Sequence, residues 1–242
     1  MREKLSALIE RLFPGMGARA FLLTILATLC MIGYWHLSGR HEVPGWFFRL
    51  SLSIWRVDSS QFHEHAWSHV LAAAILLGAP LFFCHFDGMG PRELGLSIRQ
   101  AKRELGLVLV LWLAFLPVIW AASTTDSFAR MYPRLPAVKD NVHLFIRYEG
   151  FYLVKWIAWE FFFRGFMLFA FAKDLGSKSV LVSTIPFVLM HFGKPQAEVY
   201  GSVAAGFILG WLAWRSRSIW PGVILHWLVA TSMDFFASRW WR

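Results

Sequence analysis

Long apolar runs are the feature that most limits how this chain can fold. A helix needs about 20 residues to cross the hydrocarbon core of a bilayer, and most of the runs reach or approach that length. A further aromatic-rich stretch at 46–55 is bracketed by Arg49 and Arg56, which is more typical of an interfacial helix than of a span. The seven runs expected to span the membrane are 20–37, 66–86, 105–123, 151–172, 180–191, 199–214 and 219–237.

The overall composition agrees with this interpretation. Of the 242 residues, 57% are hydrophobic and 16% are charged, whereas a soluble domain usually has about 25% charged residues. We therefore predict an all-α, polytopic membrane protein with about seven to eight transmembrane helices. We expect residues 1–90 to form an amphipathic segment and the first two spans, and residues 91–242 to form the core of a single membrane domain.

The net charge of +9 could suit nucleic acid, but the placement of the charge argues against that partner. Basic residues such as Arg99, Lys102 and Arg103 lie at the ends of expected spans, where anionic lipid headgroups are their natural partners. The density of Lys and Arg between the spans favours a cytoplasmic N-terminus. We expect a lipid bilayer rather than nucleic acid as the surrounding partner, in the plasma (inner) membrane.

Ionisable residues inside the expected spans concentrate in two of them. The fourth run carries Lys155, Glu160 and Arg164, and the last run carries His226 and Asp234. A charge at a span centre costs roughly 2.5–3.5 kcal/mol, so such residues usually face protein or water and mark function. Glu160 and Arg164 are four residues apart, on one helix face, where they could form an ion pair that is either functional or only holds helices together. Lys155 lies near the span end and is expected to snorkel.

Two histidines fall on different spans. His191 ends the fifth run and His226 lies in the last. A single membrane histidine is often an interhelical hydrogen-bonding residue. Two histidines and a carboxylate from three spans, however, are the usual ingredients of a hydrolytic metal site. Glu160, His191 and His226 could therefore hold a divalent metal such as zinc, and a site without metal stays open as well.

Three motifs occur in order, one in each of three expected spans. They are Trp-Glu-Phe-Phe-Phe-Arg-Gly at 159–165, Phe187-x-x-x-His191, and His226 in the last run. Together with the stretch Pro-Arg-Glu-Leu-Gly-Leu-Ser at 91–97, they resemble the CPBP family of intramembrane proteases, the CAAX-processing and bacteriocin-processing group. That family has Glu-Glu-x-x-x-Arg, Phe-x-x-x-His and His-x-x-x-Asn/Asp on separate membrane helices.

The resemblance implies a helical membrane fold with a cavity open to water. It also implies hydrolysis of a peptide bond near the terminus of a membrane-anchored or lipid-modified protein, with a glutamate and a histidine activating water. The positions that match the family's motifs are Glu160, Arg164, Phe187, His191 and His226.

The chain departs from the family pattern at two positions. Trp159 stands where the family has its first glutamate, and Ala230 stands where it has Asn or Asp. Glu198 could substitute, because a loop with Gly and Pro lets it fold back toward His191. Asp234 lies about 12 Å along a straight helix from His226 and ranks below Glu198.

The expected chemistry starts from Glu160, alone or with Glu198. One of these carboxylates takes a proton from a water held near His191, with Arg164 tuning the basicity of Glu160. His226 either donates to the oxyanion or binds a metal. The alternative is a non-catalytic relative that binds peptides or acts as an immunity or scaffold protein.

A second polar cluster, His63, Glu64, His65 and His69, lies at the entry to the second expected span. His65 and His69 are four residues apart, a spacing that can bind a divalent metal. The sequence is not the His-Glu-x-x-His zinc motif, because residue 67 is Trp. We favour a polar edge at the membrane interface, because ligand clusters at a single polar edge are rare.

Overall fold

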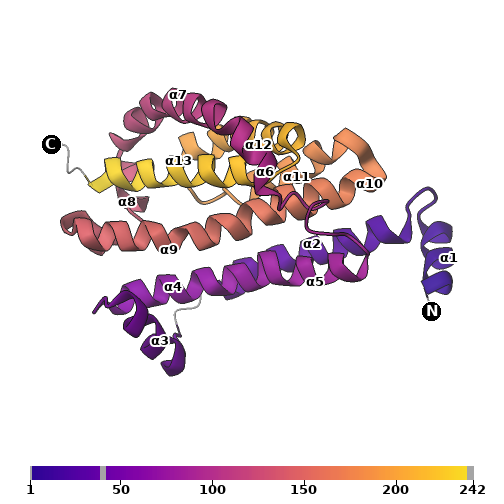
Figure 1. Ribbon diagram of the computed structural model, residues 1–242, viewed down its shortest axis with the longest axis horizontal. Helices are drawn as coiled ribbons and strands as arrows, with labels where there is room; N and C mark the ends of the chain where they lie inside the picture. Colours follow the sequence, from indigo (N-terminus) through magenta and orange to yellow (C-terminus); the bar gives the residue numbers. More distant parts are fainter. Residues whose placement is uncertain (1, 39–41, 239–242) are drawn as a thin grey trace.

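One long helical element, formed by α9 and η4, runs through the middle of the protein (Figure 1). The computed structural model describes residues 2–38 and 42–238, which contain helices and no strand, so the predicted all-α fold is confirmed for these residues. The elements are α1 (Arg2–Leu12), α2 (Ala18–Leu37), α3 (Gly45–Trp55), α4 (Ser60–Ala73), η1 (Ala74–Gly78), α5 (Ala79–Phe86), α6 (Ile98–Ala101), η2 (Lys102–Glu104), α7 (Leu105–Ser123), α8 (Asp126–Met131), η3 (Pro136–Asp140), α9 (Val142–Glu160), η4 (Phe161–Ala170), α10 (Phe171–Leu175), η5 (Gly176–Lys178), α11 (Ser179–Leu189), α12 (Gln196–Ser216) and α13 (Trp220–Ser238).

Four helical stretches within the described ranges are long and apolar enough to cross a membrane. They are α2, the continuous helix from α4 to α5, the helix from η2 to α7, and α12. These four coincide with four of the seven expected spans. The other three expected spans fall on α9–η4, α11 and α13, which do not meet the same condition of length and hydropathy, and α11 has only 11 residues. The number of seven to eight spans therefore stays a prediction.

The central helix begins at a capped terminus and becomes fully buried. The Asn141 side chain accepts a hydrogen bond from the Leu144 backbone N–H at 2.9 Å, which satisfies one of the free donors of the first turn of α9. The chain continues from α9 into η4, a π-helix whose ten residues are all buried. Helix α4 packs on one side of α9 and α13 packs on the other (Figure 1). Side chains of α9 that point toward α13 therefore lie in the protein interior.

The loop that contains 91–97 fixes the start of α13. The Ile219 N–H donates to the Gly95 carbonyl at 2.9 Å, and the Trp220 indole donates to the Leu96 carbonyl at 3.1 Å. The same loop touches η4, because a Cβ on Gly165 would lie 3.0 Å from the Leu94 carbonyl oxygen. A glycine at position 165 thus permits this close approach. The loop holds η4 and α13 in register, and these two elements flank the predicted site.

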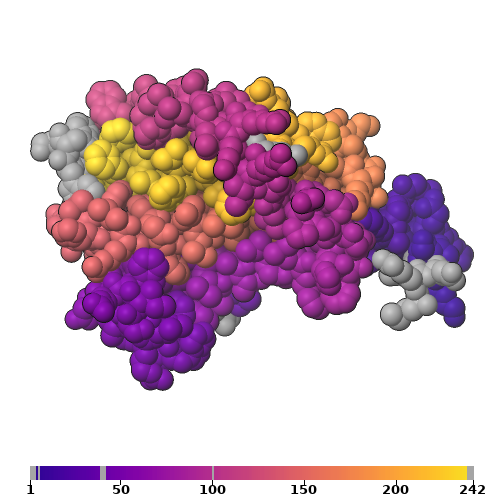
Figure 2. All heavy atoms as spheres, in the orientation of Figure 1, coloured from indigo at the N-terminus to yellow at the C-terminus, as the bar shows by residue number. Residues whose placement is uncertain are grey.

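The N-terminal segment contacts the rest of the chain through the hydrophobic core and through Arg19. Helix α1 projects from one end of the helical bundle (Figure 2). Helix α2 instead packs along the side of the bundle (Figure 1). From the first turn of α2, Arg19 donates to the Asp87 carboxylate at 2.6 Å and to the Ala170 carbonyl at 2.9 Å, and it also pairs with Asp174. Side chains from both expected segments, 1–90 and 91–242, share one hydrophobic core.

Candidate active site

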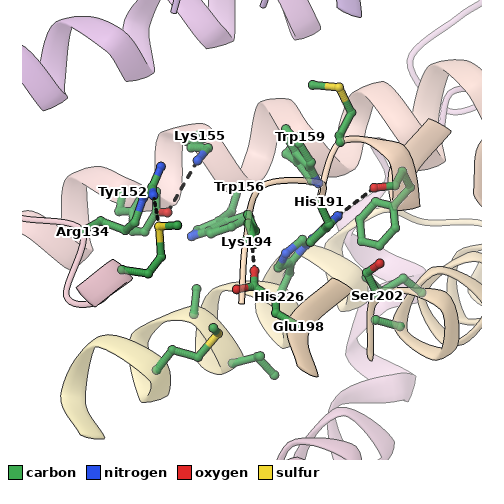
Figure 3. Close-up of a pocket in the computed structure, with 18 of the residues that line it drawn as sticks. Arg134, Tyr152, Lys155, Trp156, Trp159, His191, Lys194, Glu198, Ser202 and His226 are labelled. Carbon is green, nitrogen blue, oxygen red and sulfur yellow. Dashed lines mark hydrogen bonds and ion pairs between the residues drawn. The ribbon is translucent and has the colours of Figure 1, made fainter. Parts of the chain in front are cut away.

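A cavity of about 330 Å³ opens among α2, α9, α12, α13 and the loop that follows α11. Its lining is mostly aromatic and aliphatic, and several ionisable side chains project into it (Figure 3). Both predicted histidines, His191 and His226, line this cavity, as do Glu198 and Asp234. The structure therefore brings four of the predicted site residues to one cavity, although they come from three segments of the chain: the turn after α11, α12 and α13.

Glu160 meets His226 behind the cavity wall. The two side chains come from α9 and α13, and the His226 Nδ1 lies 2.7 Å from the Glu160 Oε1. Because a carboxylate only accepts hydrogen bonds, Nδ1–H donates and Nε2 keeps its lone pair. Trp156 packs against the imidazole, with the ring centroids 4.1 Å apart and the ring planes tilted by 32°, and restrains its orientation. This is a carboxylate–imidazole pair with one imidazole nitrogen left for the cavity.

Glu160 also forms the predicted ion pair with Arg164. The Glu160 Oε2 lies 3.6 Å from the Arg164 Nε, and both side chains are completely buried. The guanidinium lies 4.5 Å from the centre of the Phe187 ring, a cation–π contact with the next motif. Arg164 lies in the π-helix η4, a type of irregularity that often occurs at functional sites. Coulomb attraction and the aromatic contact offset part of the cost of burying the two charges.

The Glu160 carboxylate does not itself line the cavity. Gly222 in the first turn of α13 covers it closely, since a Cβ at that position would lie 2.8 Å from the Glu160 Oε2. The carboxylate is thus enclosed by His226, Arg164 and Gly222. This placement differs from the expected direct contact between Glu160 and a water near His191, because the imidazole of His226 stands between the carboxylate and the cavity.

His191 lies in the turn after α11 and is oriented by the last turn of that helix. Its Nδ1 lies 2.7 Å from the Phe187 carbonyl oxygen, so Nδ1–H donates to that carbonyl and Nε2 keeps its lone pair. The His191 ring lies 4.6 Å from the Phe187 ring and, nearly perpendicular, 6.2 Å from the Trp159 ring. The Phe-x-x-x-His spacing therefore sets the tautomer of this histidine through a hydrogen bond between residues four apart. In Figure 3 the His191 and His226 side chains lie next to each other.

Trp159 and Ala230 both line the cavity at the positions where the family has polar groups. Trp159 is 4% exposed and packs against Phe163 and Tyr34, with its ring beside His191. Ala230 contributes a methyl group to the wall one turn after His226. An indole therefore lies beside His191, at the sequence position where the family has a carboxylate.

Glu198 is held at the cavity by two partners. Its Oε1 accepts from the Lys194 ammonium and its Oε2 from the Tyr132 hydroxyl, each at 2.6 Å. Burial, and secondly the charge of Glu198, raise the pKa of the Tyr132 hydroxyl well above its usual value. Tyr132 therefore stays a donor at neutral pH. Both carboxylate oxygens of Glu198 are occupied in this arrangement.

Asp234 belongs to a second acidic pair. Its Oδ1 accepts from the Arg134 backbone N–H at 3.2 Å, and its carboxyl group interacts with that of Glu149 on α9. Glu149 in turn accepts from the Thr231 hydroxyl at 2.7 Å. Asp234 lies two turns beyond His226 on α13, and none of its described hydrogen bonds leads to His191 or His226.

The proposed metal ligands do not converge. Within the described chain, no group of three or more His, Cys, Asp or Glu side chains is placed to hold a metal ion. Glu160 and His226 use their facing atoms on each other, and the Nδ1 of His191 is bonded to a carbonyl. The residues present thus do not fit the zinc site predicted as one possibility from the sequence.

The second histidine cluster does not form a metal site either. Both ring nitrogens of His63 are hydrogen-bonded at 2.8 Å, one to Ser51 and the other to the Val57 carbonyl. His63 is fully buried, so it belongs to the packing between α3 and α4 rather than to a polar edge. His69 stacks on Tyr152 with ring centroids 4.8 Å apart.

Sequence reasoning missed three residues that shape the cavity. Lys155, expected to snorkel, lines the cavity instead, and Trp156 supports His226. Arg134 comes from the loop after α8 and also lines the cavity. Helical spacing could have predicted that Lys155 and Trp156 lie near the site, because they are within about one turn of Trp159 and Glu160 on the same helix.

Residues 141–232 match the family model described as type II CAAX prenyl endopeptidase Rce1-like. The match supports a CPBP family intramembrane protease. The matched segment contains Glu160, Arg164, His191, Glu198 and His226, and ends two residues before Asp234. The match and the apolar helices indicate an integral membrane protein. Comparison with curated proteins and with solved structures gave no match.

Proposed function

We propose that this CPBP-type protein is an intramembrane endopeptidase that hydrolyses a peptide bond near the terminus of a membrane-anchored or lipid-modified protein. The observation that carries the proposal is the hydrogen bond between Glu160 and His226, which leaves one imidazole nitrogen for a cavity that His191 shares. A carboxylate that orients a histidine is a recurrent arrangement for general-base catalysis.

The mechanism follows from these contacts. A water between the two imidazoles donates hydrogen bonds to the Nε2 atoms of His191 and His226. As the water oxygen adds to the carbonyl carbon of the peptide bond, the His226 Nε2 takes its proton. Glu160 accepts from Nδ1–H throughout and stabilises the imidazolium that forms. When the C–N bond breaks, the imidazolium returns the proton to the departing amine, which leaves a carboxylic acid and a free amine.

In this mechanism Glu160 acts through His226, and Arg164 compensates the charge of Glu160. The aromatic and aliphatic lining supports the same proposal, since it gives an apolar peptide and its membrane anchor a surface to contact. With a cytoplasmic N-terminus in the plasma membrane, the loop 193–198 faces outward. Labelling single cysteines placed in that loop from either side of intact vesicles tests this orientation.

The decisive variant is His191→Ala, because it leaves the Glu160–Arg164–His226 contacts in place. We expect loss of processing of about 10²-fold, because the attacking water loses one of the two imidazoles that position it. The measurement compares the terminal masses of membrane-anchored proteins in cells that express the wild type or the variant. His143→Ala is the matched control, since His143 is an exposed histidine on α9 away from the cavity. Unchanged processing with His191→Ala would rule out the proposed mechanism.

Trp159 favours one alternative, a non-catalytic relative that binds peptides or acts as an immunity or scaffold protein. An indole stands at the position where the family has its first glutamate, beside His191 at the cavity. In that case His191→Ala and His226→Gln would each leave the cellular phenotype intact, whereas a bulky change in the cavity wall, such as Ala230→Phe, would abolish it.

A further inference from the structure

Two cations line one end of the cavity. Lys155 comes from α9 and Arg134 from the loop between α8 and η3. Figure 3 shows both of them beside Tyr152, with the two histidines farther along the cavity. Among the residues that the structure describes, no carboxylate lies within 4.0 Å of the Lys155 ammonium or the Arg134 guanidinium. Two like charges in an apolar cavity repel each other, and an anion placed between them removes that repulsion.

The acids of the cavity are engaged with other groups. Glu198 accepts from Lys194 and Tyr132, and Asp234 accepts from the Arg134 backbone and interacts with Glu149. The Arg134 guanidinium contacts the Met131 sulfur at 2.8 Å, and that is a weak acceptor. The two cations are thus charged groups of the cavity wall that form no ion pair within 4.0 Å in the described chain, and Asp234 and Glu198 act on Lys155 only at longer range.

Aromatic rings hold the Lys155 ammonium in place. It lies 5.0 Å from the centre of the Tyr152 ring, 5.1 Å from that of Trp156 and 5.9 Å from that of Trp159. Its one hydrogen bond is to the Tyr152 hydroxyl, at 3.5 Å. These rings attract the cation and keep it at the cavity instead of letting it extend toward the membrane surface. A positioned cation with free donors is suited to bind an anion from the cavity side.

An anion bound at Lys155 would lie close to His226, the proposed general base. Trp156 lies between Lys155 and His226, and the distances of 5.1 Å and 4.1 Å to its ring place the ammonium within about 9 Å of the His226 imidazole. An extended peptide advances about 3.3–3.6 Å per residue. A charged group held at Lys155 therefore lies within a few residues of a peptide bond presented to His226.

We propose that Lys155 and Arg134 form a subsite that binds a carboxylate of the peptide substrate. This inference rests on the proposed function for the identity of the ligand as a peptide. The carboxylate is either the C-terminus of the substrate or an acidic side chain close to the cleaved bond. The subsite orients the peptide along the cavity and selects for a negative charge at a fixed distance from the reacting bond.

Binding of short peptides to the purified full-length protein in neutral detergent tests the subsite. The probes are acetyl-Ala-Leu-Ala as the free acid, the same peptide as its amide, and the amide of acetyl-Glu-Leu-Ala. Tryptophan fluorescence reports binding, because two indoles surround Lys155. At least one carboxylate peptide should bind about tenfold more tightly than the neutral amide, as a charge-assisted hydrogen bond typically gives. Which of the two does so identifies the source of the carboxylate.

Four variants connect this preference to the two cations. Lys155→Met and Arg134→Gln should each remove most of the preference, and Lys155→Arg should keep it. Lys178→Gln is the matched control, since Lys178 is an exposed lysine of η5 far from the cavity wall. Because Arg134 is exposed, its replacement tests the subsite even if Lys155→Met fails to fold.

Equal binding of the acid and amide peptides by the wild type would overturn the subsite, as would a preference that survives both Lys155→Met and Arg134→Gln. Competition by dihexanoyl-phosphatidylglycerol without any preference among the peptides would also overturn it and assign the cations to a lipid headgroup. The readout is binding and needs no turnover. A peptide preference without processing would therefore refute the proposed hydrolysis alone, and processing that depends on His191 without a peptide preference would refute the subsite alone.

Discussion

Helices α9 and α13 meet through two buried glutamates of α9 that have opposite surroundings. Glu160 contacts an imidazole and a guanidinium, whereas Glu149 contacts the Thr231 hydroxyl and the carboxyl group of Asp234. The two glutamates are eleven residues apart, about 16 Å along the helix. Both are at most 3% exposed. Residue type and burial are therefore nearly the same, and the partners alone distinguish the two regions.

The difference shows what the partners do for a buried acid. A carboxylate with a cation beside it can stay ionised in the interior, because Coulomb attraction compensates for lost hydration. Two neighbouring carboxyl groups avoid mutual repulsion only if one of them keeps its proton. Near Glu160 the balance depends on Arg164 and His226 being present together. Near Glu149 the balance depends on a proton shared by the two carboxyl groups and on the Thr231 hydroxyl. Replacing Glu149 with an amide should therefore cost less folding stability than replacing Glu160.

The largest expected effect comes from making the same change in both regions. Glu160→Gln leaves the Arg164 charge buried without its partner, and removing one member of such a pair costs about 3–5 kcal/mol. Glu149→Gln should change the free energy of unfolding by less than about 1 kcal/mol, because the amide oxygen can still accept from Thr231. Unfolding in detergent measures both changes. Similar losses in the two variants would show that the partners do not separate the two regions.

A double variant separates folding from catalysis in the Glu160 region. Glu160→Gln combined with Arg164→Met removes both charges and should recover most of the lost stability. Processing should remain absent, since His226 would still lack its carboxylate. Recovery of processing along with stability would mean that Glu160 has only a structural role.

Replacing Gly222 with alanine should lower stability by an intermediate amount, less than Glu160→Gln. Its Cβ would lie 2.8 Å from the Glu160 Oε2, so Gly222→Ala should displace the carboxylate from His226. We expect a loss of about 1–3 kcal/mol from overpacking and a fall in processing of about 10²-fold from the misplaced pair. Unfolding and terminal mass measurements report the two effects separately.

Gly201→Ala is the matched control for this change. Gly201 lies in α12, and a Cβ there would have no neighbour within 4 Å. Alanine is the better helix former, so this control should be neutral or slightly more stable. If Gly222→Ala behaves like Gly201→Ala, the close packing against Glu160 has no bearing on the site.

Patterns along one helix could be predicted from the sequence, and contacts between helices mostly could not. Apolar runs predicted helices at α2, α7 and α12, because lipid-facing residues leave a continuous signal in the sequence. The 46–55 stretch is a helix, α3, of 11 residues. The π-helix η4 leaves no comparable signal, since apart from Arg164 and Gly165 its residues are as apolar as those of an ordinary span.

The site shows the same limit. Spacing predicted the Glu160–Arg164 pair, because residues four apart share a helix face. It could not predict that Gly222 encloses Glu160, or that Asp234 lies beside Glu149, since these contacts depend on how α13 is placed against α9. Lys155 was expected to snorkel toward the membrane surface but lines the cavity, and the reason lies in its neighbours on the same helix. Aromatic residues three before, one after and four after it surround its ammonium at the cavity.

The smallest effect should come from a third acid, Glu93, which has a cation partner but lies at the surface. Its carboxylate accepts from the Gly90 backbone N–H at 2.8 Å and pairs with Lys173 at 3.1 Å. The Gly90 hydrogen bond, and then Lys173, lower the pKa of Glu93 below its usual value. Water screens an exposed pair, so Glu93→Gln should lower the unfolding midpoint by no more than about 2 °C at neutral pH.

The pH dependence of this small effect has a definite sign. A carboxyl group whose pKa is lower in the folded state contributes its stability above the unfolded pKa, near 4.5, and loses it as the pH falls through the lower folded pKa. The midpoints of the wild type and Glu93→Gln should therefore differ at neutral pH and converge in acid, as thermal unfolding across that range would show. A loss as large as that of Glu160→Gln would contradict the comparison, because it would mean that a cation partner matters equally at the surface and in the interior.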